Sequence, residues 1–352
     1  MKTEEKLSVD ALPMVTIMMP VRNEAAFIAQ TLDSILAQNY PAELMEIVIA
    51  DGRSTDNTRE IIASLQQQHA NIHLIDNPSK IAPTGLNVAI RQAQGDVIVR
   101  VDGHAILDPD YVRSCVAQMQ QTGADCVGGA WESRGKSYVG KAIAQAMSSR
   151  FGIGNSGFRV ASTSAPPRIV DTVPFGAYRR DVFERIGLFN EKMVRHQDYE
   201  LCYRLRQAGG RILLLPEVRA VYYVRATLAK LWRQYWQYGI WKGRFLRVYP
   251  ASLKLRHMMP PLFVFAVVVS SLLSLIVPSW GWLAGAVLGA YALFLLVALL
   301  NFVFRGKSKY LPLLPVIIAC LHLSWGIGVW IGLLTPSPLE DGEDKMILVK
   351  AE

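Results

Sequence analysis

Two short polar stretches contain side chains that could carry out group-transfer chemistry. Asp102 and His104, separated by one glycine, directly follow the apolar run VIVRV, and a carboxylate beside an imidazole is a donor set for a divalent cation. Asp198, in the stretch HQDYE, could accept a proton as a general base. An isolated Asp-Gly-His is also a common turn, so the elements around it decide between chemistry and a simple turn.

Those elements alternate between apolar strand-like runs and amphipathic helical segments. In order they are MVTIMMP, AAFIAQTLDSILAQ, MEIVIADG, DNTREIIASLQQQ, IHLIDN, PTGLNVAIRQAQ and VIVRVDG. This order predicts an α/β fold with a doubly wound, mostly parallel sheet and helices on both faces. Ligands of such sheets bind beyond the carboxyl ends of the strands. The polar residues expected to meet at that edge are Arg22, Asn23, Glu24, Asp51, Arg53, Asp102 and His104.

The composition indicates a soluble part joined to a membrane part. Of the 352 residues, 51% are hydrophobic, which is too many for one ordinary soluble domain. Between Glu217 and Glu340 the chain has twelve basic residues and no acidic one, so the net charge of +8 belongs to the second half. A segregated basic region suits anionic membrane lipids better than nucleic acid, and we expect the lipids and no nucleic acid as partners.

Three apolar stretches, residues 260–277, 281–304 and 311–334, are each long enough to cross a bilayer core of about 30 Å. Basic residues precede the first stretch and lie between the second and third, which predicts a multi-pass protein of the plasma (inner) membrane with a cytoplasmic N-terminal domain. The expected division is a cytoplasmic catalytic domain (1–225), a basic aromatic interfacial region (226–259), three transmembrane helices (260–335) and an acidic extracytoplasmic tail (336–352).

Three further segments carry open alternatives. Residues 227–249 interleave aromatic side chains with five Lys or Arg, which predicts an interfacial amphipathic helix, either a plain anchor or a site for the diphosphate of a polyprenyl-linked acceptor. Residues 148–172 have no helical or strand period and predict a loop, either a lid or a surface linker. His322, in the third apolar stretch, is either a neutral packed histidine or a functional group.

Five motifs, in this order, resemble the inverting family-2 glycosyltransferases. They are PVRNEAAFIAQTLDSILAQNYP (20–41), IVIADGRSTDNT (47–58), GLNVAIRQAQGDVIVRVDGHA (85–105), VPFGAYRRDVFERIGLFNE (173–191) and HQDYELCYRLRQAGGRI (196–212). The resemblance covers nearly all of residues 14–220 and implies a nucleotide-sugar-binding fold of the GT-A type. Within the family it is strongest to the membrane-anchored glucosyltransferases of succinoglycan-type exopolysaccharide assembly, which also show VDGHA and a GIGNS loop.

The resemblance also implies a role for each motif residue. Asp198 takes the place of the catalytic base, and Asp102 and His104 take the places of the metal site, whose second member is usually Asp. His104 has the metal-coordinating place of that second Asp, and Asp102 contacts the ribose or the water shell of the metal. The histidine favours Mn²⁺ as the cofactor, with Mg²⁺ as the alternative, because Mg²⁺ prefers oxygen ligands alone. The residues implied to bind substrate are Pro20, Arg22, Asn23, Glu24, Asp51, Arg53, Asn87, Asp102, Phe175, Gly176, Gln197 and Trp241.

Three positions depart from the family's pattern. Asp51 is followed by Gly52, where the family often has a second acid, so the resemblance rather than this motif carries the expectation of a uracil base. Gln197 precedes Asp198 where an acid is usual, so the base has no adjacent carboxylate. Ile240 stands where the Gln-x-x-Arg-Trp motif of processive synthases has its arginine, which argues against processive synthesis.

We therefore expect an inverting, metal-dependent enzyme that transfers a hexose, glucose from UDP-glucose, to a lipid-linked saccharide or lipid acceptor at the cytoplasmic membrane face. The product would belong to exopolysaccharide or glycolipid biosynthesis. A polyprenyl-phosphate sugar transferase and a processive polysaccharide synthase are the alternatives among enzymes. A nucleotide-sugar-binding membrane scaffold, in which Asp-Gly-His is a degraded metal site, is the alternative outside them.

Overall fold

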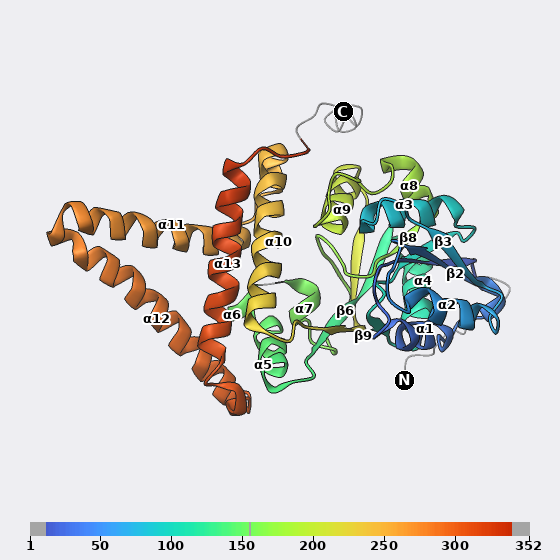
Figure 1. Cartoon of the computed structure of the whole chain (residues 1–352), viewed down its shortest axis with the longest axis horizontal. Helices are drawn as coiled ribbons and strands as arrows, with labels where there is room; N and C mark the ends of the chain where they lie inside the picture. The colour runs from blue at the N-terminus through green and yellow to red at the C-terminus, as the bar shows by residue number, and fades with distance from the viewer. Residues whose placement is uncertain (1–11, 155, 340–352) are drawn as a thin grey trace. The chain divides into compact units, whose positions relative to one another are not determined.

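The computed structural model describes residues 12–154 and 156–339, and these form two compact units. The first unit comprises residues 12–132 and 161–222 and is built on a β-sheet. The second comprises residues 133–160, apart from 155, and residues 223–339, and it is mainly helical (Figure 1).

One half of the sheet consists of four parallel strands in the order β3-β2-β1-β4. They are β1 (Val15–Val21), β2 (Met45–Asp51), β3 (Ile72–Asp76) and β4 (Val97–Arg100), joined by α1 (Ile28–Leu36), the short helix η2 (Ala42–Leu44), α2 (Thr58–Gln66) and α3 (Ala82–Gln92). Most of these strands are continuous buried runs, as expected for a parallel sheet covered on both faces. The doubly wound arrangement predicted from the alternating runs is confirmed for this half.

The other half of the sheet is antiparallel, so the sheet as a whole is mixed. It contains β5 (Ala105–Leu107), β6 (Cys126–Arg134), β7 (Arg168–Ile169), β8 (Ala177–Arg179) and β9 (Ile212–Tyr223), with α4 (Tyr111–Thr122), α8 (Arg180–Ile186) and α9 (Gln197–Gln207). Strand β8 pairs with β4, and β6, β9 and β5 follow it, while β7 pairs with β9. Strands of two or three residues, such as β7 and β8, are too short to show a period of two in the sequence.

Side chains of β4 alternate between the two faces of the sheet. Val97 and Val99 belong to the main hydrophobic core, which they share with apolar residues of α1, α2 and α4. Ile98 and Arg100 therefore project from the opposite face, because successive side chains of a strand point to opposite sides. Helix α3 packs on β1 and β2. The alternation thus places one arginine, Arg100, on an otherwise apolar strand face.

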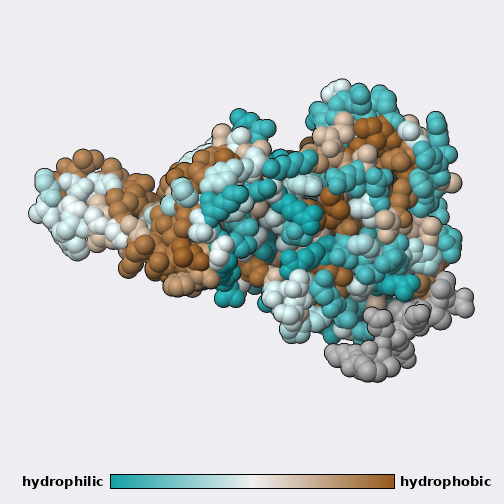
Figure 2. Space-filling model, turned by 90° about the horizontal axis from the view of Figure 1, so that it is seen from below, coloured by the Kyte–Doolittle hydropathy of each residue, from teal (hydrophilic) through white to brown (hydrophobic). Residues whose placement is uncertain are grey.

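The second unit contains the long helices of the C-terminal half. Its elements are α5 (Tyr138–Met147), α6 (Arg150–Ile153), α7 (Gly157–Val160), α10 (Leu228–Val248), η3 (Pro250–Ser252), α11 (Leu255–Ile276), η4 (Pro278–Trp280), α12 (Gly281–Phe304), η5 (Ser308–Tyr310) and α13 (Leu314–Leu334). In the described part of the chain, three segments are long and apolar enough to cross a membrane: His257–Ile276, Pro278–Phe304 and Leu314–Leu334. They coincide with the three predicted stretches, and apolar side chains are exposed on α11 and α12 (Figure 2).

Helices α10 and α13 lie side by side along their length (Figure 1). Glycines line the contact: a Cβ atom at Gly239 or Gly243 of α10, or at Gly328 or Gly332 of α13, would overlap the backbone of the other helix. Small residues let two helix backbones approach closely. The sequence predicted helix α10 but not its pairing with an apolar helix.

The segment predicted as a loop, residues 148–172, contains α6, α7 and β7 in its described part. Ser149 caps α6 by accepting a hydrogen bond from the backbone N–H of Phe151. His322 of α13 lies 3.1 Å from the Tyr291 hydroxyl of α12 and also bonds the backbone at Phe151. These contacts give His322 a packing role that joins α6, α12 and α13.

Candidate active site

The turn that carries Asp102 and His104 is pressed against the loop that follows β1. The hydroxyl of Thr31 donates a hydrogen bond to the carbonyl of Gly103 at 3.1 Å. A Cβ atom at Gly103 would lie 3.0 Å from Cγ of Glu24, so a larger residue would push that side chain aside by a few tenths of an ångström. Two of the polar clusters expected at the carboxyl edge of the sheet are therefore in direct contact.

His104 is oriented by a carboxylate. Its Nδ1 lies 2.9 Å from Oε1 of Glu24, and the two side chains are 28% and 21% exposed. When a carboxylate accepts the proton of one imidazole nitrogen, the other nitrogen becomes the metal-binding atom with a fixed direction. Nε2 is thus the atom of His104 that would coordinate a cation.

Asp102 is held by Arg100, the last residue of β4, which lies two residues earlier in the chain. Nε and Nη2 of Arg100 donate to Oδ1 of Asp102 at 3.1 and 2.9 Å. The arginine side chain is only 10% exposed, and burial alone would lower its pKa. The Asp102 and Asp198 carboxylates more than offset this, so the pKa of Arg100 lies above its usual value. The guanidinium is therefore a permanent cation inside the site.

Asp198 is the second residue of α9, and its carboxylate reaches the same guanidinium. Its Oδ1 accepts from the backbone N–H of Tyr199 at 3.0 Å, and its Oδ2 lies 3.9 Å from Nη1 of Arg100. The positive end of the helix dipole also favours a carboxylate at this position. The Asp198 side chain is 39% exposed, so it can meet a substrate while Arg100 faces it from the sheet.

Asp102 and His104 fit a divalent cation as a pair. The described residues contain no cluster of three or more His, Cys, Asp or Glu side chains that could hold a metal ion. Both hydrogen bonds from Arg100 go to Oδ1 of Asp102, which leaves Oδ2 as the oxygen that could be a ligand. A protein oxygen and an imidazole nitrogen suit a cation whose other ligands come from a diphosphate and water.

Asp51, in contrast, has a fully buried carboxylate that is committed to neighbouring protein groups. Its Oδ1 accepts from the Ser54 hydroxyl at 2.5 Å, and its Oδ2 accepts from the Ser54 N–H at 3.1 Å and from Arg59 at 3.0 Å. Asn23 and Arg53 flank it in left-handed backbone, with φ of 56° and 55°. The acid thus fixes the shape of the loop after β2.

Five other residues predicted to bind substrate lie in or just after β1, just before β8 and at the start of α9. Pro20 lies in β1, and Arg22 is exposed just after that strand. Phe175 precedes β8 with φ of 46°, and the carbonyl of the next residue, Gly176, accepts from the backbone N–H of Arg100 at 3.0 Å. Gln197 is the buried first residue of α9, next to Asp198. Their contacts with substrate stay predictions.

Two predicted residues have other surroundings. The amide of Asn87 is 2% exposed and bonds the backbone N–H and carbonyl of Phe189 and the carboxylate of Glu191, so it holds the 189–191 loop. Trp241 lies on α10 in the second unit, with the guanidinium of Arg244 5.2 Å from its ring. For both residues the substrate contact also stays a prediction.

Sequence reasoning missed an aromatic group beside the turn that carries Asp102 and His104. Trp131 of β6 and Tyr222 of β9 stack with ring centroids 4.3 Å apart and planes 3° apart. Tyr222 lies 6.2 Å from the ring of His104, and Trp131 lies 5.5 Å from Phe175. The pair forms an apolar wall of the kind that lines small-molecule sites. Only an aromatic residue near the end of each strand signalled it in the sequence.

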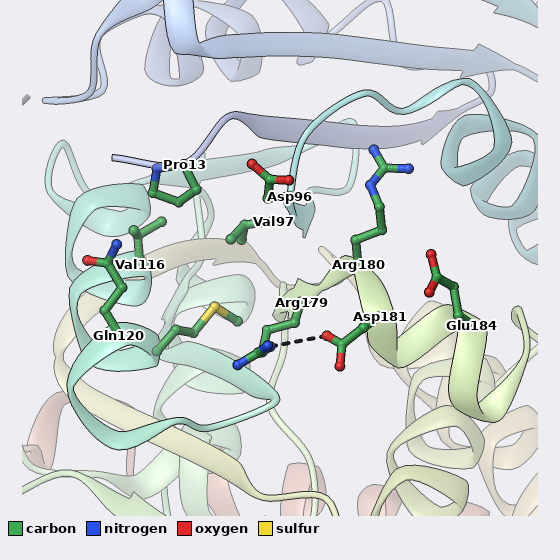
Figure 3. Close-up of a pocket in the computed structure, with 10 residues that line it drawn as sticks. Pro13, Asp96, Val97, Val116, Gln120, Arg179, Arg180, Asp181 and Glu184 are labelled. Carbon is green, nitrogen blue, oxygen red and sulfur yellow. Dashed lines mark hydrogen bonds and ion pairs between the residues drawn. The ribbon is translucent and has the colours of Figure 1, made fainter. Parts of the chain in front are cut away.

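A hollow on the first unit lies at the end of the sheet where β4 begins. Its lining includes Val97, which begins β4, and Arg179, which ends the antiparallel strand β8 (Figure 3). Arg179 is bonded there to Asp181 at 3.1 Å. Asp102 follows the opposite, carboxyl end of β4, so this hollow is not the place where Asp102 and Asp198 meet.

Comparison with known proteins decides the family. The model of Glycosyl transferase family 2 matches residues 16–187. The succinoglycan biosynthesis protein ExoA of Rhizobium meliloti (strain 1021) is 32% identical over 336 residues, which is 95% of this chain and 98% of that protein. The chain belongs to glycosyltransferase family 2. The prediction of this family and of an enzyme of this class is confirmed.

Two further proteins extend the likeness of this family-2 glycosyltransferase. A dolichyl N-acetyl-alpha-D-glucosaminyl phosphate 3-beta-D-2,3-diacetamido-2,3-dideoxy-beta-D-glucuronosyltransferase of Methanococcus voltae is 26% identical over 328 residues, 91% of this chain and 97% of that one. The solved structure of the mannosyltransferase PcManGT from Pyrobaculum calidifontis, in complex with GDP-Man and Mn²⁺, superposes with a TM-score of 0.57 at 18% identity. It covers 90% of this chain and 88% of that chain. The GT-A type of fold is therefore confirmed.

Proposed function

We propose that this family-2 glycosyltransferase transfers glucose from UDP-glucose, with inversion at the anomeric carbon, to a lipid-linked saccharide or lipid acceptor. The observation that carries the proposal is the link from Asp102 through Arg100 to Asp198. It ties the acid assigned to the donor and the acid assigned to the acceptor to one buried cation. The succinoglycan biosynthesis relative supports a place in exopolysaccharide or glycolipid synthesis.

The reaction we propose is a single displacement. The acceptor hydroxyl oxygen forms a bond to the anomeric carbon while the bond from that carbon to the diphosphate oxygen breaks. Asp198 takes the hydroxyl proton, and the bonding electron pair leaves with the nucleoside diphosphate. One general base is sufficient, because attack from the side opposite the leaving group needs no covalent intermediate.

Asp102 and His104 would hold the divalent metal ion at the donor, with Glu24 orienting His104. Bound there, the ion would neutralise charge that develops on the departing diphosphate. The Mn²⁺ in the solved mannosyltransferase complex supports manganese as the cofactor, and Mg²⁺ is the alternative.

For the membrane part we propose a location in the inner membrane with the catalytic unit on the cytoplasmic side. The three apolar helices support spanning, and the exposed basic residues of α10, which are Lys230, Arg233 and Arg247, support contact with lipid phosphates. The M. voltae relative, named for a dolichyl-linked sugar phosphate acceptor, supports a lipid-linked acceptor here. The acidic tail from residue 340 onward lies outside the described residues, and its extracytoplasmic place stays a prediction.

The test is the release of nucleoside diphosphate from a panel of nucleotide sugars by the full-length protein in membranes. Each donor is assayed with Mn²⁺, Mg²⁺ or a chelator, and the lipid product is identified by mass spectrometry. We expect metal-dependent turnover with UDP-glucose and the gain of one hexose on the acceptor. Asp181→Asn is the matched control, because Asp181 is a half-exposed acid bonded to Arg179 outside the site.

Five results would overturn parts of this proposal. No turnover with any donor would favour the scaffold, and turnover with another nucleotide sugar would change the donor. A polymer would indicate a processive synthase, and a sugar on a polyprenyl monophosphate would indicate a polyprenyl-phosphate sugar transferase. Full activity of Asp198→Asn would remove Asp198 from the role of base.

A further inference from the structure

Arg100 is a charged residue in a strand where every neighbour is apolar and buried. It ends the strand VIVR, its side chain is 10% exposed, and its backbone N–H bonds the carbonyl of Gly176. Burying a guanidinium is costly unless carboxylates and hydrogen bonds compensate it. Such a residue on the strand that leads into Asp102 therefore calls for a function that an apolar residue could not serve.

The guanidinium is only partly satisfied. Nε and Nη2 donate to Asp102, but Nη1, which is buried, has no hydrogen-bond partner within the described ranges 12–154 and 156–339. The carboxylate facing Nη1 is that of Asp198, at 3.9 Å, which is within ion-pair range but longer than a hydrogen bond. Nη1 is therefore a donor that a small movement of Asp198 would satisfy.

The tyrosine that acts on Arg100 from β8, Tyr178, carries no charge that would compete for Nη1. Tyr178 of β8 is 1% exposed, and its hydroxyl lies 3.9 Å from Sγ of Cys202, one helical turn after Asp198. Burial raises the pKa of Tyr178 well above its usual value, so the phenol stays neutral. Arg100 and Asp198 thus face each other beside a buried, neutral phenol, and the partly buried side of this ion pair makes it stronger than a pair in water.

We propose that Arg100 is a positioning residue that holds the donor-side carboxylate of Asp102 and the acceptor-side carboxylate of Asp198 in one fixed geometry. This inference rests on the proposed function, because it takes Asp198 as the base. One guanidinium with a planar fork can bond one acid through Nε and Nη2 and face another through Nη1. A lysine has a single charged centre and cannot do both with the same geometry.

Arg204, on the same helix as Asp198, provides the matched comparison. It is also buried and ion-paired, with Nε donating to Glu200 at 2.6 Å. Its Nη1 and Nη2 bond the carbonyls of Ile186 and Leu188, which fixes the end of α8. Arg204 therefore serves the packing of α8 and α9 and does not contact Asp198.

The experiment is a double-mutant cycle on the full-length protein in membranes. The parent, Arg100→Lys, Asp198→Asn and the double variant are compared for kcat, for acceptor and donor KM, and for the melting temperature. We expect Arg100→Lys to lower kcat about 30-fold in the parent and less than about 3-fold when Asp198 is already Asn. When two residues act as a unit, the effects of their substitutions on kcat are not additive in this way. The effects of a general loss of structure are additive.

The Arg204→Lys cycle with Asp198→Asn is the control, and its effects on kcat should multiply independently. Arg100→Met, which removes the charge but keeps an unbranched apolar stem, is the second variant and should lose more activity than Arg100→Lys. The inference would be overturned if Arg100→Lys lowered kcat equally in both backgrounds, or if both Arg100 variants kept an activity within threefold of the parent. In either case, turnover by the parent would still support the proposed function. No turnover by the parent would overturn both.

Discussion

The two halves of the site use carboxylates in different ways. After β2, Asp51 is fully buried, and its oxygens are occupied by Ser54 and Arg59. At the start of α9, Asp198 is 39% exposed and meets its arginine only at 3.9 Å. Both positions match motifs of the same family. The Asp51 carboxylate is nevertheless buried and fully bonded, whereas the Asp198 carboxylate is partly exposed.

This difference separates residues that build the site from residues that react in it. A buried acid whose hydrogen bonds are complete contributes to stability and loop shape, and its removal costs its neighbours the hydrogen bonds they made to it. An acid that is half exposed and incompletely bonded contributes little to stability and is available for proton transfer. The following predictions test this contrast, beginning with the largest effect.

Asp198→Asn should lower kcat about 1,000-fold, because a general base typically contributes about 10² to 10⁴ in rate. Nucleotide affinity and the melting temperature should stay close to those of the parent, since the carboxylate makes one backbone bond and one long ion pair. Steady-state kinetics and thermal melting check this. A large loss of stability would place Asp198 in the same class as Asp51.

His104→Ala should lower metal-stimulated turnover about 100-fold with little change in fold, because it removes one of two predicted metal ligands. His104→Asp should shift the preference from Mn²⁺ towards Mg²⁺, which favours oxygen ligands. Metal titrations of activity measure both effects. If both variants respond to metals as the parent does, His104 is only a turn residue.

Asp51→Asn should destabilise the protein by about 1–3 kcal/mol, since a buried, fully bonded carboxylate is replaced and Arg59 loses the closer of its two carboxylate partners. The nucleotide affinity should fall by no more than about tenfold, through the altered loop. Asp76→Asn is the control, because that acid is 47% exposed and its loss should change stability by less than about 0.5 kcal/mol. Unchanged stability of Asp51→Asn would contradict the assigned role.

Asp56→Asn should have the smallest effect, visible as a change in pH dependence. A hydrogen bond from the Thr58 hydroxyl, with backbone bonds from Ala25 and Thr58, lowers the pKa of Asp56. Its contribution to stability is therefore present above its unfolded-state pKa and is lost as the pH falls through the lower folded-state pKa. As the pH is lowered from 7 to 3, the melting temperature of the variant should fall less steeply than that of the parent. An identical slope in the two proteins would exclude this contribution.

The parallel half of the sheet and its polar edge could be predicted from the sequence. Long apolar runs such as β1 and β2 alternate with amphipathic helices, and the residues after such strands meet at one edge for purely topological reasons. The contact between the turn at Gly103 and the Glu24 loop follows from that rule. Asp198 could be identified only by resemblance. Its helix, α9, belongs to the antiparallel half of the sheet, where short strands such as β8 could not be predicted from the sequence.

The contacts that the sequence could not predict are those made by single side chains. Arg100 stands in an apolar run that reads as a buried strand, and its partners Asp102 and Asp198 are two and 98 residues away. The Trp131 and Tyr222 stack joins strands distant in sequence. From the sequence alone, the glycines of α10 and α13 are only residues of low helix propensity. The close contact between the two helices explains why glycine occupies these positions. The arginine inside the apolar run VIVR is the feature of the sequence that marks this contact.

The central claim, a single displacement assisted by one base, is tested most directly by the anomeric configuration of the transferred sugar. Proton NMR of the purified lipid product gives this configuration from the coupling of the anomeric proton. From a donor with an α-linked glucose, the account predicts a β-linkage in the product. An α-linkage would contradict it, because retention of configuration requires a different mechanism from direct attack assisted by Asp198.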